Sequence, residues 1–492
     1  MHGARTGTVS VPLHMLAGET RPVSGPTKLT SGAEPPLPAR AKPDPRGPQT
    51  RTRGAALGAQ TGGRDWGWNA SSASVSSCAP ICRWATAQVC AIMAAIRRAQ
   101  PGPVRKPHRH EVERLKLAID ARSIVAKPTG VGATSFYLTQ AIGRRLGAGS
   151  CVAIVGPECP TQVAASLPCR LVRSSVSTQS HLKCEAWEHL WLPHLLSREG
   201  ADVLLSLAWI TPIAAPQKRV TVIHDVIALV MPGSFPRAYT AYLRYRVHMA
   251  ARTSHAIIAV SERTKQDLLR VTGADARKVH VIPEAACLPP AEVEAARLRE
   301  PGGQIGRDVG RPYVLAVGSR EPRKNLRRLV EAFRLAKQTR SLPHVLLLVG
   351  PSTAWGDAAV ASANPGWVEQ DVYVTGYVER QSELIDLYRG ASAFAFLSLY
   401  EGFGLPVLEA MLCGTPVVAS GTTSIPEVAG DAAVLVDPTS VTSIARGLEQ
   451  VLTDTALRER LVEAGRRRAA SFSWELTATR VLELCNALLS GG

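Results

Sequence analysis

Short apolar segments alternate with helical stretches along most of this chain, and that alternation limits its fold more than any other feature. The first series begins at Leu115, where a helical run from Ala133 to about Leu146 follows the first strand. The strands expected in this series are Leu117–Asp120, Val152–Val155, Val203–Leu205, Val220–Ile223, Ala256–Val260 and Val279–Ile282. Strands that alternate with helices predict a parallel sheet connected by right-handed crossovers.

The pattern starts again after a break rich in proline, glycine and charge, from Pro283 to about Arg311. The second series of expected strands is Tyr313–Val317, Val345–Val349, Val372–Thr375, Ala393–Phe396, Pro416–Ala419 and Ala433–Val436. Helices are expected from about Asn325, Gln381, Leu405 and Val441. The sequence therefore predicts an α/β protein in which two Rossmann-like, doubly wound parallel-sheet domains face each other across a cleft. Ligands of such sheets bind at the carboxyl ends of the strands.

Residues 1–112 have a different composition, rich in Pro, Gly, Ser, Thr and Arg and without a sustained period. Such a segment buries too little apolar surface to offset the entropy lost on ordering. Residues 1–114 hold 16 Lys and Arg against 6 Asp and Glu, and the rest holds 41 against 34, so this segment carries most of the net charge of +17. We expect a disordered basic leader. Met93 is then a candidate for the true start, and a regulatory tail is the alternative.

The boundaries that follow are 1–112 for the leader, 113–290 for an acceptor-side domain, 291–472 for a donor-binding domain and 473–492 for a C-terminal helix that crosses back to the first domain. No window reaches the roughly 18 apolar residues that span a bilayer, and no signal peptide is evident. A cytoplasmic location is therefore expected. The ten cysteines form no CxxC pair, and no metal site is expected.

The densest chemical motif runs from Glu401 to Glu409 and reads Glu-Gly-Phe-Gly-Leu-Pro-Val-Leu-Glu. Pro406 suits a first helical turn, because its missing N–H would have no partner there. Glycines let the backbone approach a ligand, and free amides at a helix start attract phosphate or sugar oxygens. We expect Glu401 in the loop and Glu409 in the helix to contact different parts of one elongated ligand. The alternative is a pair of carboxylates that only stabilise a helix start.

The stretch from Glu401 through Gly414-Thr-Pro-Val-Val-Ala-Ser420 to Pro426-Glu427-Val428 resembles retaining glycosyltransferase family 4, which has the GT-B fold and a Glu-x7-Glu signature. The resemblance covers about residues 115–488. It implies that Glu401 contacts hydroxyls of the donor sugar and that Glu409 holds the ribose. It also implies that backbone amides line the sugar and the diphosphate, those of Gly402, Phe403, Gly404 and Leu405.

Three cations cluster in the segment Gly318-Ser-Arg-Glu-Pro-Arg-Lys-Asn325, between an expected strand and an expected helix. A departing nucleoside diphosphate develops negative charge, which fixed cations stabilise. The alternative is a solvated basic helix start, which the helix dipole disfavours. By the resemblance, Lys324 is the phosphate-binding lysine. Its companion is Arg320 or Arg323, and the sequence leaves that choice open.

Two further segments of the first series follow expected strands. Gly130 and Gly132 form a loop that, by the resemblance, approaches the phosphates or the acceptor. His224 follows the strand Val220–Ile223 and should face the cleft, although a purely structural histidine is the alternative. The resemblance implies that His224 hydrogen-bonds the donor sugar near its reacting carbon and that Asp225 fixes the loop.

A turn in the second series follows the strand Val372–Thr375, and the resemblance implies that its backbone reads the nucleobase through Gly376, Tyr377 and Val378. Ser261 is expected to cap a helix. The segment Val281–Cys287 departs from the family, many members of which carry an Asn-Gly or His-Gly turn after the proline. We expect this departure to alter local hinge geometry.

A helical stretch from Pro236 to Arg252 combines tyrosines three residues apart with four arginines. These residues are Tyr239, Tyr242, Tyr245, Arg237, Arg244, Arg246 and Arg252. The tyrosine spacing favours one packed face. The alternative is that the arginines touch an anionic lipid-linked acceptor or the membrane surface.

The sequence thus predicts a metal-independent glycosyltransferase without a cofactor, retaining by the resemblance. Ile119-Asp-Ala-Arg122 together with Glu321-Pro-Arg-Lys-Asn325 resembles mannosyltransferases of bacterial surface polysaccharide synthesis. That resemblance implies GDP-mannose as the donor and a glycan or lipid-linked glycan as the acceptor. We also expect peripheral contact at the inner membrane face and no nucleic-acid partner. The alternatives are a UDP-glucose-type hexosyltransferase, a nucleotide-sugar epimerase on the same fold and an inactive nucleotide-sugar-binding subunit.

Overall fold

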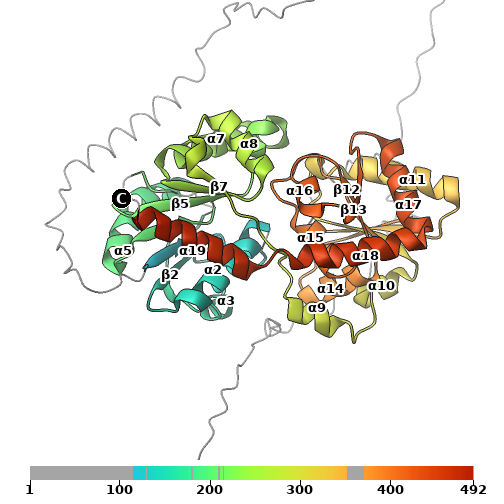
Figure 1. The fold of residues 1–492 in the computed structure, drawn as a ribbon, viewed down its shortest axis with the longest axis horizontal. Helices are drawn as coiled ribbons and strands as arrows, with labels where there is room; N and C mark the ends of the chain where they lie inside the picture. Colours follow the sequence, from blue (N-terminus) through green and yellow to red (C-terminus); the bar gives the residue numbers. More distant parts are fainter. Residues whose placement is uncertain are drawn as a thin grey trace, which may run out of the picture. The chain divides into compact units, whose positions relative to one another are not determined.

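The structure is a computed structural model that describes residues 115–490 except 129, 179–180, 209–210, 214 and 352–370. The expected leader and the candidate start at Met93 lie outside the described residues. The described chain forms two parallel β-sheets, each flanked by helices (Figure 1). We call the first sheet and its helices the first lobe, and the second sheet and its helices the second lobe.

The first sheet has the strand order β3-β2-β1-β4-β5-β6-β7, and all its strand pairs are parallel. The strands are β1 (Leu117–Asp120), β2 (Cys151–Val155), β3 (Arg170–Arg173), β4 (Val203–Ser206), β5 (Lys218–Ile223), β6 (Ala256–Ala259) and β7 (Val279–Val281). Central strand β1 places Leu117 opposite both Cys151 and Val203. The strand order reverses between β1 and β4, which is the switch point at which open α/β sheets bind ligands.

Strand β3 was not predicted from the sequence. It lies at the edge of the sheet, pairs only with β2, and reads Arg-Leu-Val-Arg. Its residues are mostly exposed, whereas β1 and β4 are buried throughout. Parallel strands produce an apolar run only where both faces are covered, so an edge strand of this kind leaves no such signal.

The helices of the first lobe pack on both faces of its sheet. They are α2 (Gly130–Leu146), α3 (Thr161–Ala165), α4 (His181–Leu190), α5 (Leu192–Glu199), α6 (Ile227–Val230), α7 (Arg237–Thr253) and α8 (Glu262–Thr272), with 3-10 turns at Pro232–Ser234 and Ala276–Lys278. Helix α2 begins at Gly130, three residues before the predicted start at Ala133. The amides of a first helical turn have no partner within the helix, which makes this turn a tolerant place for glycine.

The second sheet has the order β10-β9-β8-β11-β12-β13, again parallel, with its switch point between β8 and β11. The strands are β8 (Tyr313–Val317), β9 (Val345–Val349), β10 (Val372–Thr375), β11 (Ala393–Phe396), β12 (Val417–Ser420) and β13 (Ala433–Val436). These match the predicted strands within one residue at each end. The helices are α9 (Pro290–Ala296), α10 (Gly303–Val309), α11 (Leu326–Arg340), α14 (Gln381–Gly390), α15 (Leu405–Leu412), α16 (Ile425–Ala429), α17 (Val441–Thr453) and α18 (Thr455–Ala470), with a 3-10 turn at Pro322–Lys324.

The last helix, α19 (Trp474–Ser490), packs against α2 of the first lobe (Figure 1). The ring of Trp474 stacks on Tyr137 of α2 with 6.1 Å between ring centroids. Its Nε1–H donates to the carbonyl oxygen of Ala286 at 2.9 Å. Trp474 therefore joins the end of the chain to the segment that leaves the first sheet.

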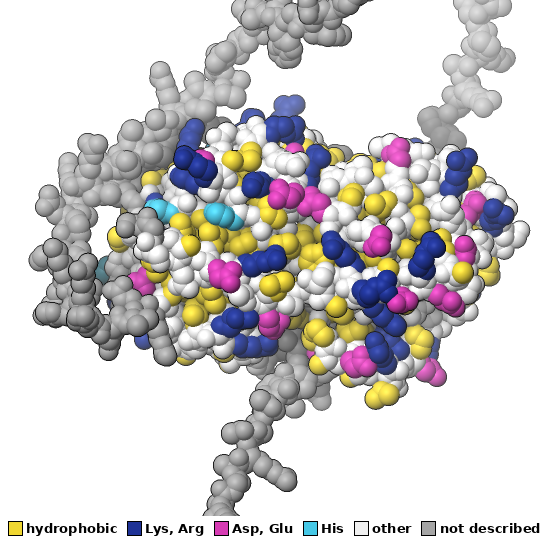
Figure 2. Space-filling view, in the orientation of Figure 1, with side chains coloured by type: hydrophobic (Ala, Val, Ile, Leu, Met, Phe, Trp, Pro, Cys, Tyr) yellow, Lys and Arg dark blue, Asp and Glu magenta, His cyan; other side chains and the backbone are white. Residues whose placement is uncertain are grey.

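In the described part of the chain, no helix is long and apolar enough to cross a membrane. On the face that carries α18 and α19, basic and acidic side chains are interspersed (Figure 2).

We predict that Trp474→Ala lowers the free energy of unfolding by about 3–5 kcal/mol, the usual cost of emptying a buried aromatic site. Urea denaturation measures this change. Leu476→Ala is the matched control, because Leu476 lies in the same helix and is 40% exposed. Its effect should stay within about 0.5 kcal/mol. Equal losses for the two variants would contradict the anchoring role of Trp474.

Candidate functional site

The site is built at the carboxyl ends of the neighbouring strands β8 and β11. Chain leaving β8 turns through Gly318 and the 3-10 turn Pro322–Lys324, and chain leaving β11 reaches Glu401. Strands β8 and β11 are adjacent at the point where the strand order reverses. The two predicted motifs are separated in sequence by the 76 positions from Asn325 to Glu401, but they come together at this edge of the sheet.

Glu401 lies at the centre of an ion cluster. Its Oε1 accepts from Nζ of Lys324 at 2.7 Å and from Nη1 of Arg323 at 2.9 Å. Arg323 also donates through Nε to Glu321 at 2.7 Å. The side chains of Lys324 and Glu401 are only 11% and 13% exposed. A β-carbon at Gly318 would lie 3.3 Å from Cε of the Lys324 side chain, so this glycine leaves room for the lysine.

Burial and charge act against each other in this cluster. Burial disfavours the charged form of Glu401, but Lys324 and Arg323 outweigh it and hold the pKa of Glu401 below its usual value. Burial, together with repulsion by Arg323, lowers the pKa of Lys324 despite its pairing with Glu401. Lys324 and Arg323 thus share the carboxylate of Glu401, and Arg323 also pairs with Glu321, so the cluster contains two cations and two carboxylates.

Arg320 does not join this cluster. Its side chain is buried, and Nη1 donates to the carbonyl oxygens of Gly350 at 2.9 Å and Thr375 at 3.1 Å. These contacts tie together the ends of β9 and β10. Of the two arginines that the sequence left open, the structure therefore brings Arg323 to Lys324.

The loop Glu401–Gly404 is held by hydroxyl groups from three directions. Ser424 donates to the carbonyl oxygens of Glu401 at 3.0 Å and Phe403 at 2.8 Å. Ser261 and Thr264, from the first lobe, donate to the carbonyl of Gly402 at 2.6 and 3.0 Å. Ser261 also caps α8, as predicted, by accepting from the amide of Thr264. Within the described part of the chain, the amides of Gly402, Phe403 and Gly404 donate to no protein acceptor.

Glu409 lies inside α15, as predicted, and is buried. Its Oε2 accepts from the hydroxyl of Tyr388 at 3.1 Å, and the backbone of Cys287 also hydrogen-bonds the carboxylate. Burial raises the pKa of Glu409 above its usual value. The carboxylate therefore lies between a tyrosine of α14 and the segment that connects the two sheets. Tyr388 was not predicted from the sequence. Its position fits the apolar pattern of α14, so nothing distinguishes it from an ordinary core residue.

His224 follows β5, and both its ring nitrogens contact protein acceptors. Nε2 lies 2.7 Å from the carbonyl oxygen of Leu207, and Nδ1 lies 2.9 Å from Oε1 of Glu284. A carbonyl oxygen only accepts, so Nε2 carries a proton. Burial opposes the charged ring, but Glu284 outweighs it and raises the pKa of His224. The backbone of His224 also lies close to the loop Glu401–Gly404, because a β-carbon at Gly402 would collide with the carbonyl oxygen of His224.

Glu284 lies in the segment Val281–Cys287, for which the sequence predicts altered hinge geometry. Its carboxylate instead pairs with His224, 60 residues earlier. The available signal was an acidic residue at the carboxyl end of a predicted strand. Asp225, beside the histidine, accepts from the amide of Ile227 at 3.0 Å and so fixes its own loop, as predicted.

The remaining predicted residues lie around this cluster. Gly130 is in the first turn of α2, and a β-carbon there would contact the side chain of Leu405 at 3.8 Å. A β-carbon at Gly132 would meet the carbonyl oxygen of Ser123 at 2.9 Å, so Gly132 serves close packing. Gly376, Tyr377 and Val378 follow β10, and the hydroxyl of Tyr377 donates to Pro128 at 3.4 Å.

The tyrosine and arginine stretch forms α7, whose Arg246 is buried. It pairs with Glu188 and Glu185 of α4, and Glu188 also pairs with the fully buried Arg122. Arg246 therefore does not offer its charge to a lipid surface, contrary to that alternative. Tyr239 and Tyr245 are 38% and 39% exposed, so the tyrosines do not form the packed face that their spacing predicts.

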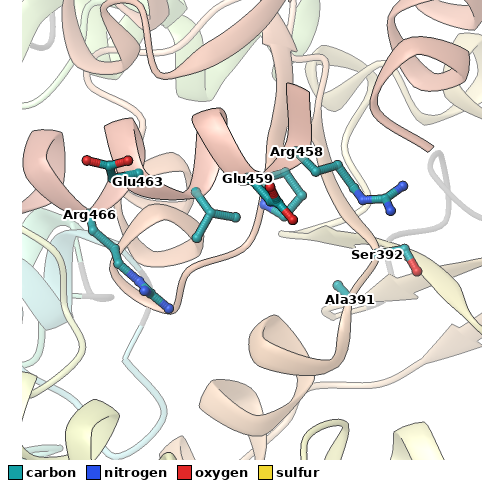
Figure 3. A pocket seen from close by; sticks show the side chains of 8 residues that line it. Ala391, Ser392, Arg458, Glu459, Glu463 and Arg466 are labelled. Carbon is teal, nitrogen blue, oxygen red and sulfur yellow. The ribbon is translucent and has the colours of Figure 1, made fainter. Parts of the chain in front are cut away.

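A cavity of about 400 Å³ lies away from the cluster, where α18 passes over the amino end of β11 (Figure 3). Its lining includes Arg458, Glu463 and Arg466 from α18 and Ser392 from the strand start. Ligands of parallel sheets bind at the opposite, carboxyl ends, so we do not assign the site to this cavity. Among the described residues, no group of three or more His, Cys, Asp and Glu side chains could hold a metal ion.

Solved structures show the same architecture. Sucrose-phosphate synthase from Thermosynechococcus elongatus matches with a TM-score of 0.59 and 20% identity, over 77% of this chain and all of that one. HepE from Anabaena, solved with UDP and glucose, matches with a TM-score of 0.57 and 19% identity, over 76% of this chain and all of that one. Two doubly wound parallel sheets of this kind define a GT-B fold, which confirms the predicted fold class.

Sequence comparisons identify the family. Residues 129–286 match the family described as Glycosyltransferase Family 4, and residues 302–468 match Glycosyl transferases group 1. O-antigen chain mannosyltransferase B of Escherichia coli is 32% identical over 54% of this chain and 69% of its own. The chain therefore belongs to glycosyltransferase family 4 and is a glycosyltransferase, as its Glu-x7-Glu motif predicted.

Two further relatives differ in coverage. Serotype-specific mannosyltransferase WbdA of Escherichia coli is 31% identical over 56% of this chain, and the match spans 34% of WbdA. D-inositol 3-phosphate glycosyltransferase of Xylanimonas cellulosilytica is 28% identical over 64% of this chain and 76% of its own.

We predict that Glu284→Gln destabilises the protein in a pH-dependent way. Because the pKa of His224 is raised in the folded state, the pairing stabilises fully below the usual histidine pKa of about 6.5 and is lost as pH rises through the folded pKa. Thermal melting at about pH 6 and about pH 9 should show a large deficit at the lower pH and a smaller one at the higher. A deficit independent of pH would contradict an ionised histidine.

Proposed function

We propose that this glycosyltransferase transfers mannose from GDP-mannose to a glycan or lipid-linked glycan, with retention of anomeric configuration. The two mannosyltransferases of Escherichia coli, at 31 and 32% identity, support mannose as the sugar. A UDP-linked hexose is the second candidate, since the structurally similar HepE holds UDP and glucose and a D-inositol 3-phosphate glycosyltransferase is also a relative.

The observation that carries the proposal is the pair of largely buried cations, Lys324 and Arg323, that meet at the carboxylate of Glu401. As the bond between the sugar and the diphosphate breaks, its electron pair moves to a phosphate oxygen. Fixed cations in a partly buried site stabilise that charge without reorganising. We assign the leaving diphosphate to Lys324 and Arg323, and we propose that these cations make a divalent metal unnecessary.

The other contacts follow the order of an elongated donor. We assign hydroxyls of the sugar to Glu401, the ribose to Glu409 and the nucleobase to the turn Gly376–Val378. Within the described residues the amides of Gly402, Phe403 and Gly404 donate to no protein acceptor, and with the amide of Leu405 and the start of α2 at Gly130 they would meet the sugar and the diphosphate. We call residues 401–405 the donor loop. Helix N-termini and glycine-rich loops suit such oxygen ligands.

His224 would act through its position beside the loop more than through a ring nitrogen. Both nitrogens contact protein acceptors, whereas the backbone carbonyl lies next to Gly402. We propose that the acceptor binds to the first lobe and that the domain boundaries lie near residues 290 and 472. We also propose that the enzyme acts in the cytoplasm at the membrane surface.

Lys324→Ala should lower kcat by about 100- to 1,000-fold, the scale of losing one preorganised electrostatic group. Donor KM should change less, because Arg323 and the loop amides still bind the diphosphate. Lys324→Arg should rescue only partly, since the guanidinium is planar and bulkier. Arg327→Ala is the control, a nearby cation that is 63% exposed and pairs with Glu331. Parent-like kcat in a correctly folded Lys324→Ala enzyme would refute the role.

Binding of a panel of nucleotide sugars, measured calorimetrically in excess EDTA, tests the proposal itself. GDP-mannose should bind best without added metal. Glu409→Ala should weaken binding of free GDP by about ten- to a hundredfold, the effect of losing a hydrogen bond to a charged group. Glu401→Ala should chiefly impair the sugar-bearing donor. Preference for a UDP-sugar would select the second candidate, and a strict magnesium or manganese requirement would reject metal independence.

A further inference from the structure

The amino end of α8, in the first lobe, contacts the second lobe at two points. The hydroxyls of Ser261 and Thr264 both donate to the carbonyl oxygen of Gly402, and all three residues are buried. Beside them, the carboxylate of Glu427 in α16 accepts from the amides of Glu262 and Arg263 at 2.8 Å each. The first turn of one lobe's helix therefore holds both the donor loop and the helix that follows β12.

These hydroxyls fix the orientation of a peptide group in the loop. In a planar trans peptide, the C=O and the N–H point in opposite directions. With the Gly402 carbonyl directed at α8, the N–H of Phe403 must point away from α8. Gly402 itself packs so closely on His224 that any side chain there would collide with it. The loop cannot turn over while α8 stays in contact.

The neighbouring peptides are held differently. The carbonyls of Glu401 and Phe403 both accept from Ser424, which belongs to the same lobe as the loop. Those two peptide orientations are therefore available whether or not the lobes are in contact. Only the central peptide, between Gly402 and Phe403, takes its orientation from the opposite lobe.

We propose that Ser261 and Thr264 are positioning residues for donor-sugar recognition, which makes the shape of the donor loop depend on contact between the lobes. This inference rests on the proposed function of the loop. Nucleotide binding should depend on it less, because Glu409 lies on α15 and is held by Tyr388. The interaction links sugar recognition, more than nucleotide recognition, to the docking of α8.

The test compares the parent with Ser261→Ala, Thr264→Val and the double variant. Each single variant should raise donor KM about fivefold and the double variant about tenfold or more, on the scale of one hydrogen bond each. The Kd of the free nucleoside diphosphate should rise clearly less than donor KM, because Lys324, Arg323 and Glu409 still hold the nucleotide. Ser261→Thr and Thr264→Ser keep a hydroxyl and should restore most of the donor affinity.

Ser440→Ala is the matched control. Ser440 caps α17 by accepting from the amide of Ser443, as Ser261 caps α8, but its side chain donates to no part of the loop. It should lose similar stability without changing donor KM. Hydrogen exchange of the ligand-free protein adds a second measurement. Exchange across residues 401–405 should be faster in the double variant than in Ser440→Ala.

A double variant with parent-like donor KM and parent-like exchange would overturn the proposal. Equal losses of donor and diphosphate affinity would also overturn it, because they would show a general structural defect. If the parent binds no nucleotide sugar, the proposed function fails first. The exchange measurement then decides by itself whether α8 holds the loop.

Discussion

The shared carboxylate of Glu401 is the interaction on which the rest of the site depends. It holds Lys324 and Arg323 in a largely buried position where neither cation would be stable alone, since burying an unpaired charge is costly. Glu321 adds a second carboxylate to the cluster through its pairing with Arg323. The surrounding elements serve this arrangement: Gly318 makes room for the lysine, and Asn325 joins the loop to the ends of β11 and β13 through Leu397 and Pro438.

Contacts between distant segments complete the site. The stretch from Pro283 to Cys287 that leaves the first sheet is bound by Thr477 and Trp474 of α19, and its Cys287 meets Gln381 and Glu409. A carboxylate assigned to the nucleotide thus lies against the connection between the lobes. Together with the contact of α8 on Gly402, this places the proposed donor site at contacts between the two lobes.

Glu284 shows how a departure from a family pattern can have a chemical consequence. Its carboxylate pairs with Nδ1 of His224 and raises the pKa of that ring. The backbone carbonyl of His224 in turn lies against Gly402. A residue expected to affect hinge geometry therefore also fixes a histidine whose backbone contacts the loop Glu401–Gly404.

The sequence by itself determined the two parallel sheets, the Glu-x7-Glu loop and helix, and the cation segment. Their signals are local, because buried strands are apolar runs and helix starts carry glycine and proline. It failed at edge strand β3, which is exposed and so has no apolar pattern. Only the tertiary structure brought Arg323 rather than Arg320 to Lys324, paired Glu284 with His224 and brought Ser261 to Gly402. These contacts join residues 60 to 141 positions apart, and such distances are set by strand order and lobe contact, which no local pattern encodes.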